Sequence, residues 1–151
     1  FCNTRKNTDF LGNNLKAVGI NAMAIHGGLT QERRNRVMKQ FHAEDVRVLV
    51  CTDVAARGLD IPSVTQIYNY DIPRDSKDYI HRIGRTARAG KEGRAISILS
   101  SRDYDSFRRV MRLNGIAITE KTLPDVKKVR IKFKVRGSGF RVHGSRFTVQ
   151  G

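Results

Sequence analysis

Residues 46–51 read VRVLVC, and this short apolar run indicates the fold of the whole chain. Apart from Arg47 it is continuously apolar, as is typical of a strand buried on both faces of a parallel sheet. Working outward, we predict strands at 22–25, 64–70 and 95–99 and a strand stub at 1–2. Helices are predicted at 7–18, at 30–41 after the N-cap Thr30, from the cap Ser76 onward, and at 102–113. This alternation predicts an α/β fold of three layers, a parallel sheet with helices on both faces.

The composition changes near Pro124. Lys and Arg outnumber Asp and Glu by 29 to 14, a net charge of +15. Residues 121–151 hold nine of these basic side chains and one acidic one. Within them, VRIKFKVR at 129–136 alternates apolar and basic residues, which is the pattern of a half-buried strand. We therefore expect a main domain at 1–120 and a small basic β-rich appendage at 121–151, with a solvated segment as the alternative.

The bulk properties bound the class of protein. A net charge this positive favours nucleic acid or another polyanion as partner. Cys2 and Cys51 follow no metal-ligand spacing and form no disulfide framework, so we expect buried free thiols, no metal site and a cytoplasmic location. The sequence contains no apolar run of membrane-spanning length, so no membrane partner is expected. Because the chain opens at Phe1 with neither Met nor a leader, we interpret it as the interior of a longer polypeptide.

Four polar clusters each follow a predicted strand. They are Asn3-Thr4-Arg5, His26-Gly27-Gly28, Thr52-Asp53 with RGLD at 57–60, and Asp71-Ile72-Pro73. In an open parallel sheet, ligands gather at the carboxyl ends of the strands, so these clusters should converge on one edge. Each also has a simpler interpretation, because Asn3, Thr4 and Asp53 are good helix caps and a Gly pair suits a tight turn. Gln31 and Arg34 are equally compatible with an exposed helix face.

Residues 79–90, YIHRIGRTARAG, are rich in cationic side chains. If they are helical, His81, Arg85 and Arg88 share one face at i, i+4 and i+7. Arginine suits multidentate phosphate contact, so this face is suited to a nucleotide, although a solvated basic helix is the alternative. Gly84 would cost about 1 kcal/mol inside a helix, which suggests that a ligand or another backbone comes close.

The chain has no phosphate-cradling loop of its own. Residues 115–122 resemble one, but Glu120 replaces the second glycine. An Asp-Glu-Ala-Asp tetrad for Mg²⁺ is also missing from the sequence. The sequence therefore predicts a shared site, to which this chain brings arginines and another module brings the main nucleotide pocket.

Three segments resemble motifs IV, V and VI of DEAD-box ATP-dependent RNA helicases: FCNTR at 1–5, VLVCTDVAARGLDIP at 48–62 and residues 79–90. The likeness covers about residues 1–115 and is to the second, C-terminal RecA-like lobe. His81 at the start of motif VI fits the DEAD-box group, whereas DEAH-box and RecQ helicases usually have Gln there. The resemblance does not extend to residues 121–151.

The resemblance implies roles for individual residues. ATP and Mg²⁺ would be held mainly by the first lobe. Arg85 and Arg88 are similar to arginine fingers for the γ-phosphate, His81 to the histidine that couples the lobes, and Arg82 to the arginine that orders motif VI. These four are the expected catalytic set. Gly58 and Asp60 match ribose contacts, and Asp71 matches a short interlobe element. The expected RNA-backbone contacts are Thr4, Arg5, Gly28, Gln31, Arg34, Thr52 and Asp53.

The resemblance therefore implies one half of an ATP-driven enzyme that unwinds RNA duplexes, inactive by itself. Its expected partners are RNA and the N-terminal RecA-like lobe of the same polypeptide. Two alternatives remain at this stage. One is a non-catalytic module that binds or anneals RNA through its basic tail, and the other is a lobe of a DNA-directed translocase of the same superfamily.

Overall fold

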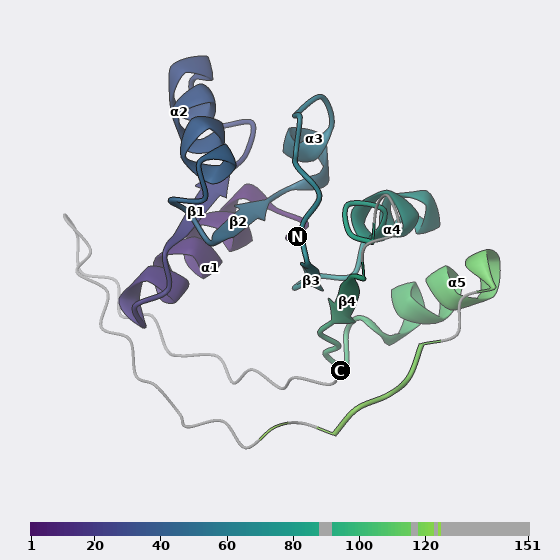
Figure 1. Ribbon diagram of the computed structural model, residues 1–151. Helices are drawn as coiled ribbons and strands as arrows, with labels where there is room; N and C mark the ends of the chain where they lie inside the picture. The colour runs from purple at the N-terminus through teal and green to yellow at the C-terminus, as the bar shows by residue number, and fades with distance from the viewer. Residues whose placement is uncertain (88–91, 116–117, 123, 125–151) are drawn as a thin grey trace.

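Strands and helices alternate along the chain in the computed structural model, which describes residues 1–87, 92–115, 118–122 and 124 (Figure 1). The predicted α/β fold is confirmed. The elements, in order, are α1 (Arg5–Ala17), β1 (Ala22–Ile25), α2 (Gln31–His42), β2 (Val48–Cys51), α3 (Asp53–Ala56), β3 (Gln66–Asn69), α4 (Ser76–Ile83), β4 (Arg94–Ser97) and α5 (Tyr104–Asn114).

The first two residues join two parallel strand pairs. β1 pairs with β2, and β3 pairs with β4. Between the pairs, the Cys2 amide donates to the Cys51 carbonyl at 2.9 Å, and the Tyr70 amide donates to the Phe1 carbonyl at 3.0 Å. Cys2 also forms a parallel bridge with Thr52. The spatial order is therefore β1, β2, the stub, β3 and β4, and the N-terminus lies between β2 and β3 (Figure 1).

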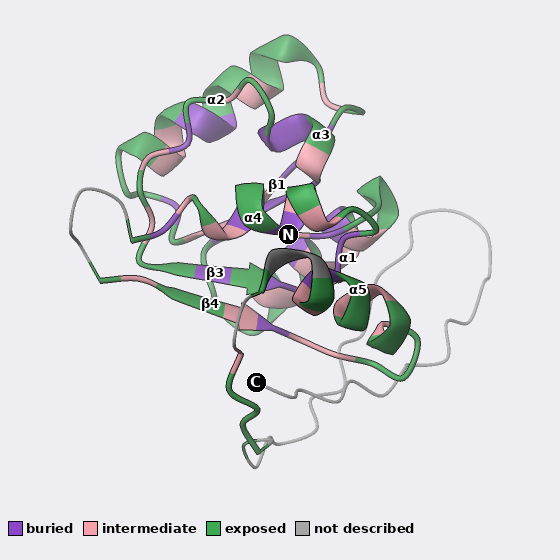
Figure 2. Cartoon of the chain, turned by 90° about the vertical axis from the view of Figure 1, so that its right-hand side faces the viewer, coloured by how far each residue is buried: buried purple, intermediate pink, exposed green. Residues whose placement is uncertain are grey.

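Helices cover opposite faces of β1. On one face, Gly12 of α1 lies so close to the strand that a Cβ there would be 3.4 Å from the Cβ of Ala24. The next residue, Ile25, points the other way and packs with Val37 and Met38 of α2. A second apolar cluster joins Ile72, Tyr79 of α4 and Val110 of α5. Figure 2 shows buried residues on β1 and exposed residues on the outer surfaces of α2 and α5.

Several boundaries differ from the prediction for local reasons. α1 begins at Arg5 because the Thr4 hydroxyl accepts the Asn7 amide at 3.1 Å and caps the helix. Ser76 was predicted to cap α4, but it is the first residue of that helix. The cap is Asp75, whose carboxylate accepts the Lys77 amide at 2.8 Å. The predicted cap Thr30 is confirmed by its bond from the Arg33 amide.

The helix predicted from Ser76 does not extend to Arg85, so the single helical face considered for His81 and Arg85 does not form. α4 ends at Ile83, with Gly84 as its C-cap. Beyond it the chain tightens into a turn, because the Arg85 and Thr86 amides donate to carbonyls three residues back, those of Arg82 and Ile83, both at 3.1 Å. The Arg85 carbonyl accepts the Val64 amide at 3.1 Å. A Cβ on Gly84 would lie 3.1 Å from the Ile80 carbonyl oxygen, so a side chain would be crowded at this position. Arg85 therefore leaves the helix that carries His81.

Some predictions fall outside the described residues. Arg88 is one of them, and so are residues 125–151, which hold almost all of the predicted β appendage. The domain boundary near residue 120 stays a prediction. Within the described ranges, none of the helices has both the length and the apolar character needed to cross a bilayer.

Candidate functional site

Arg82 lies at the centre of the region where the polar clusters converge. It is only 1% exposed, although it is an arginine on a short helix. Its Nε and Nη2 donate to the two carboxylate oxygens of Asp53, both at 2.7 Å. Nη2 also donates to the Asn3 side chain at 2.9 Å. Nη1 donates to the Asp71 carbonyl at 2.6 Å and to the Asn69 side chain at 3.3 Å. All five N–H donors of the guanidinium are thus matched.

These bonds join four separate segments. Asn3 follows the stub, Asp53 begins α3, Asn69 ends β3 and Asp71 lies in the following loop. The guanidinium carbon also sits 5.2 Å from the centre of the Phe1 ring, within cation–π range. Arg82 was expected in the catalytic set as the arginine that orders motif VI, and the structure places it in the interior with every donor occupied. It positions the site and has no donor left for a ligand.

Asp53 and Asp71 are also committed to internal contacts. Asp53 was expected to face RNA, but its carboxylate is held by the Arg82 guanidinium and is 19% exposed. The Asp71 carboxylate accepts the Asn3 amide at 2.8 Å and the Asn7 side-chain amide at 3.0 Å. It thus ties the loop after β3 to the first turn of α1. Both acids fix the relative positions of strand ends in this structure.

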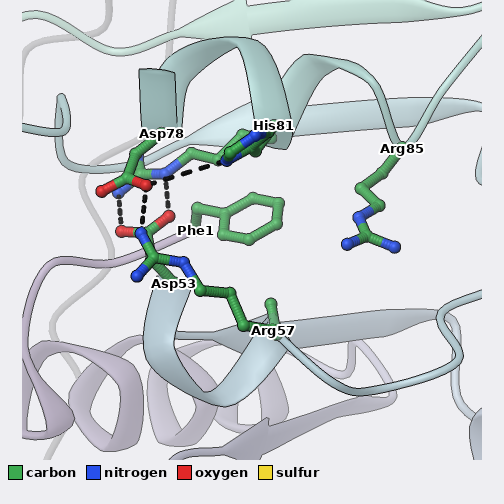
Figure 3. A pocket seen from close by; sticks show the side chains of 8 residues that line it. Phe1, Asp53, Arg57, Asp78, His81 and Arg85 are labelled. Atoms are coloured by element: carbon green, nitrogen blue, oxygen red, sulfur yellow. Dashed lines mark hydrogen bonds and ion pairs between the residues drawn. The ribbon is translucent and has the colours of Figure 1, made fainter. Parts of the chain in front are cut away.

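A small pocket opens beside this cluster (Figure 3). The residues that line it come from the stub, α3 and its C-cap, α4, and the turn after α4; they are Phe1, Asp53, Ala56, Arg57, Asp78, His81, Arg82 and Arg85. Arg57 and Asp78 form an ion pair across it. His81 Nδ1 lies 4.0 Å from the Asp78 carboxylate, and the imidazole side chain is 69% exposed.

Arg85 projects into the same pocket from the turn after α4. Figure 3 shows it on the side away from Asp78, with the Phe1 ring between them. Its backbone is fixed, since its amide donates to the Arg82 carbonyl at 3.1 Å and its carbonyl accepts from Val64. It is half-buried, and its guanidinium makes no hydrogen bond or ion pair with any residue that the structure describes. Of the predicted nucleotide residues, the structure thus brings His81, Arg82 and Arg85 together.

Gly58 and Asp60 do not line this pocket. Both are exposed in the loop that follows α3. Gly58 has φ +78°, a left-handed conformation that glycine adopts without strain, so it sets the course of that loop. Their predicted contact with a ribose stays a prediction.

The predicted RNA-facing residues divide into exposed and internal ones. Arg5 and Gly28 are exposed neighbours, because a Cβ on Gly28 would lie 3.7 Å from the Arg5 side chain. Gln31 is exposed in the first turn of α2, where its side chain donates to Asn35 at 2.8 Å. Thr4 is exposed at the start of α1 but caps that helix.

Two further members of the RNA set are mainly internal. Thr52 is buried, and its hydroxyl caps α3 by accepting the Ala55 amide at 3.3 Å. Arg34 reaches the Ala55 carbonyl at 3.4 Å, while its buried Nε has no hydrogen-bond partner. The Thr52 side chain therefore caps α3, and the Arg34 side chain links α2 to α3.

His26 orders the glycine loop that faces this surface. Its imidazole is buried, and Nδ1 accepts the Gly28 amide at 3.1 Å. Its Nε2 lies 3.0 Å from the carboxylate of Asp9 on α1. A neutral ring with its proton on Nε2 satisfies both contacts, so His26 links the loop to α1.

The two cysteines are buried free thiols, as predicted. Burial raises the pKa of the Cys2 thiol to about 12, and it raises the pKa of Cys51 as well. Both thiols therefore stay protonated near neutral pH and are poor nucleophiles. No group of three or more His, Cys, Asp or Glu side chains suited to a metal ion occurs among the described residues.

Sequence reasoning missed several members of the site. Phe1 and Asp78 line the pocket, and Asn69 accepts from Arg82; Arg57, which also lines the pocket, was named only as part of the RGLD cluster and not as a site residue. Phe1 and Arg57 lie inside the motif-like segments, which was an available signal. Asn69 and Asp78 had no such signal, since only the folded chain brings them near Arg82 and Arg57.

Comparisons with known proteins agree with this geometry. The family model described as "Helicase conserved C-terminal domain" matches residues 1–90. The ATP-dependent RNA helicase DDX47 of Drosophila melanogaster is 45% identical over 119 residues, which are 79% of this chain and 24% of that protein. This chain therefore spans about a quarter of the length of that curated relative.

Solved structures give the same picture. A DEAD box protein from the hyperthermophile Methanococcus jannaschii superposes with a TM-score of 0.73 at 41% identity, over 78% of this chain and 32% of that one. Dbp5 of S. cerevisiae, bound to RNA and ADP BeF3, superposes with a TM-score of 0.69 at 35% identity, over 79% and 32% of the two chains.

Proposed function

This chain belongs to the helicase conserved C-terminal domain family, as a C-terminal domain of the DEAD-box RNA helicase type, and from that premise we propose that it is the second lobe of an ATP-dependent enzyme that unwinds RNA duplexes. In this proposal the nucleotide binds between the two lobes. This lobe supplies cations to the triphosphate and a surface for the RNA backbone. We also propose that helices cover both faces of the whole sheet, which gives three layers, and that residues 1–120 form the main domain.

The observation that carries the proposal is the position of the Arg85 guanidinium and its lack of an acidic partner among the described residues. This guanidinium lies in a pocket beside an exposed imidazole. Its neighbour Arg82 is fully engaged and holds the surrounding segments in place. A cation fixed in advance and aimed at developing phosphate charge stabilises a transition state without further reorganisation. Arg85 fits that role, and Arg88 keeps its place in the proposal as a second finger.

ATP and Mg²⁺ fit this lobe only in part. The residues that line the pocket offer cations to phosphates, whereas the described residues provide no cluster of metal ligands. We therefore assign the metal and the phosphate-cradling loop to the first lobe. ATP bound there supplies the reactive phosphoanhydride. This chain orients it through Arg85 and His81, and Gly58 and Asp60 are proposed to meet the ribose, with Asp71 fixing the interlobe side of the loop.

The proposed RNA surface runs along the exposed side of the strand ends. Thr4, Arg5, Gly28 and Gln31 are exposed there, and Arg34, Thr52 and Asp53 support them from within. Contacts from such residues go to phosphate and sugar, so they position a strand without reading its sequence. The Dbp5 structure, which is described as bound to RNA and ADP BeF3, supports an RNA surface and a nucleotide site in the proposed enzyme.

The proposal is tested by Arg85→Ala in a two-lobe protein that contains this chain. RNA-stimulated ATP turnover should fall by about 10³ or more, as expected when an arginine finger is removed. Arg94→Ala, which removes an exposed arginine of β4, is the matched control and should leave turnover unchanged. Turnover of Arg85→Ala within a factor of about two of the unmodified protein contradicts the proposal.

A second candidate is an RNA-binding module that acts without ATP. It is favoured by the nine basic and one acidic side chains of residues 121–151. If the tail dominates, RNA affinity should fall steeply with salt, and this dependence should collapse when 121–151 is deleted. A third candidate is a DNA-directed translocase. A comparison of RNA with DNA of identical sequence distinguishes it, because only RNA carries the 2′-hydroxyl. We also propose a cytoplasmic location, which the two free thiols support.

A further inference from the structure

Gly93 lies directly against the turn that carries Arg85. A Cβ built on Gly93 would be 2.1 Å from the Thr86 hydroxyl oxygen, 2.5 Å from the Ala87 amide nitrogen and 2.9 Å from the Thr86 Cβ. All three distances are shorter than real Cβ atoms show. The φ angle of Gly93 is not left-handed, unlike that of Gly58. Glycine is therefore required here because a side chain would have no room, and not because of the backbone conformation.

The turn is also held from its other side. The Thr86 hydroxyl donates to the Val64 carbonyl at 2.5 Å, and the Val64 amide donates to the Arg85 carbonyl at 3.1 Å. Thr86 is 7% exposed, so it has no open space to move into. Ala87 has φ +54°, a conformation that a residue with a Cβ keeps only when its surroundings impose it. The turn is thus enclosed between the segment before β3 and the segment before β4.

We propose that Gly93 is a positioning residue for Arg85: its missing side chain lets the segment before β4 press the turn against Val64 and so sets where the guanidinium stands in the pocket. This inference rests on the proposed role of Arg85. The closest backbone atom, the Ala87 amide nitrogen, cannot rotate away as a side chain can. Any side chain at position 93 therefore displaces the backbone of the turn, and Arg85 with it.

The displacement has a predictable effect on catalysis. A misplacement of a reacting group by about 1 Å costs about 10²-fold in rate. A contact that is made in the transition state changes kcat, while KM changes little. Gly93→Ala should therefore lower kcat by about 10² and leave the KM for ATP nearly unchanged.

The test uses a two-lobe protein that contains this chain, with RNA-stimulated ATP turnover as the readout. Four variants are compared: Gly93→Ala, Arg85→Ala, their combination, and Glu92→Ala as an exposed neighbour with no expected effect. If Gly93 acts through Arg85, adding Gly93→Ala to Arg85→Ala causes no further loss, because coupled residues are not additive. An equal additional loss in the double variant overturns the inference.

The outcomes separate the inference from the proposed function. If Arg85→Ala leaves turnover unchanged, the proposed function fails. If Arg85→Ala lowers turnover and Gly93→Ala does not, only the role of Gly93 fails. Thr86→Val keeps the inference testable if Gly93→Ala does not fold, since it removes the hydrogen bond to Val64 without adding a steric overlap. Thr86→Val should lower kcat, but by less than the loss expected for Gly93→Ala. This loss should disappear in the Arg85→Ala background. A loss that persists in that background overturns the inference.

Discussion

Removing the Arg82 side chain should destabilise this chain more than removing any exposed arginine. Arg82→Met keeps most of the aliphatic volume but takes away every donor. It leaves the carboxylate of Asp53, which is 19% exposed, without its cation. It also leaves the side chains of Asn3 and Asn69 without the donor they have in the folded chain.

The magnitude follows from burial. Breaking a buried ion pair by removing one partner costs about 3–5 kcal/mol, because the remaining charge is uncompensated. Domains of this size are stable by about 5–15 kcal/mol, so the loss is a large fraction of the total. With a urea m-value of about 2 kcal/mol/M, a loss of about 4 kcal/mol lowers the unfolding midpoint by about 2 M.

Urea unfolding of the 151-residue chain, followed by circular dichroism, measures this loss. Arg82→Lys should fall between the unmodified chain and Arg82→Met, since lysine keeps the charge but not the planar fork of donors. The double variant Arg82→Met with Asp53→Asn should be more stable than Arg82→Met alone, because it removes the unpaired charge. The exposed Arg94→Met is the control. A loss below about 1 kcal/mol for Arg82→Met, the value for an exposed ion pair, would refute the reasoning.

Two further predictions concern His26, on the one hand, and the Cys2 thiol and the Tyr70 phenol, on the other. His26→Phe removes the acceptor of the Gly28 amide and the contact with Asp9, so it should cost about 1–3 kcal/mol in urea unfolding and weaken RNA binding; an unchanged midpoint contradicts this. The pKa of the Cys2 thiol is raised from 9.0 to about 12, and the pKa of Tyr70 from 10.0 to about 12, both mainly by burial. The folded chain thus holds these protons more tightly than the unfolded chain, so this stability is complete below about pH 9 and is lost as pH rises toward about 12. The urea midpoint should fall over that range, and less so in Cys2→Ala, whereas a midpoint that stays level or rises with pH contradicts the assignment.

Local signals predicted much of the fold. The apolar run at 46–51 indicated a buried parallel strand, and β2 is parallel to β1. Thr30 was predicted to cap α2 and does so. These features depend on neighbours in the chain, where propensity and periodicity act. The stub at Phe1-Cys2 was also predicted, although its place between the two strand pairs was not.

The errors concern residues whose conformation or contacts depend on partners that are far away in the sequence. α4 ends at Ile83, and the turn after it is held by the bond from the Val64 amide to the Arg85 carbonyl, a contact that no helical pattern predicts. Arg82 and Arg85 look alike in the sequence, but only Arg82 meets Asn3, 79 residues away, and Asp53. The resemblance assigned an ordering role to Arg82 and a finger role to Arg85, but the sequence did not reveal the partners that occupy every donor of Arg82.

The central claim is that Arg85 contacts the γ-phosphate position of a nucleotide held by the neighbouring lobe. Its most direct test is the affinity of a two-lobe protein containing this chain for ADP and for ADP with beryllium fluoride, in the presence of RNA, with and without Arg85→Ala. We predict that the variant binds ADP as the unmodified protein does and loses the added affinity for the fluoride complex. Equal affinity of both proteins for the fluoride complex would contradict the claim.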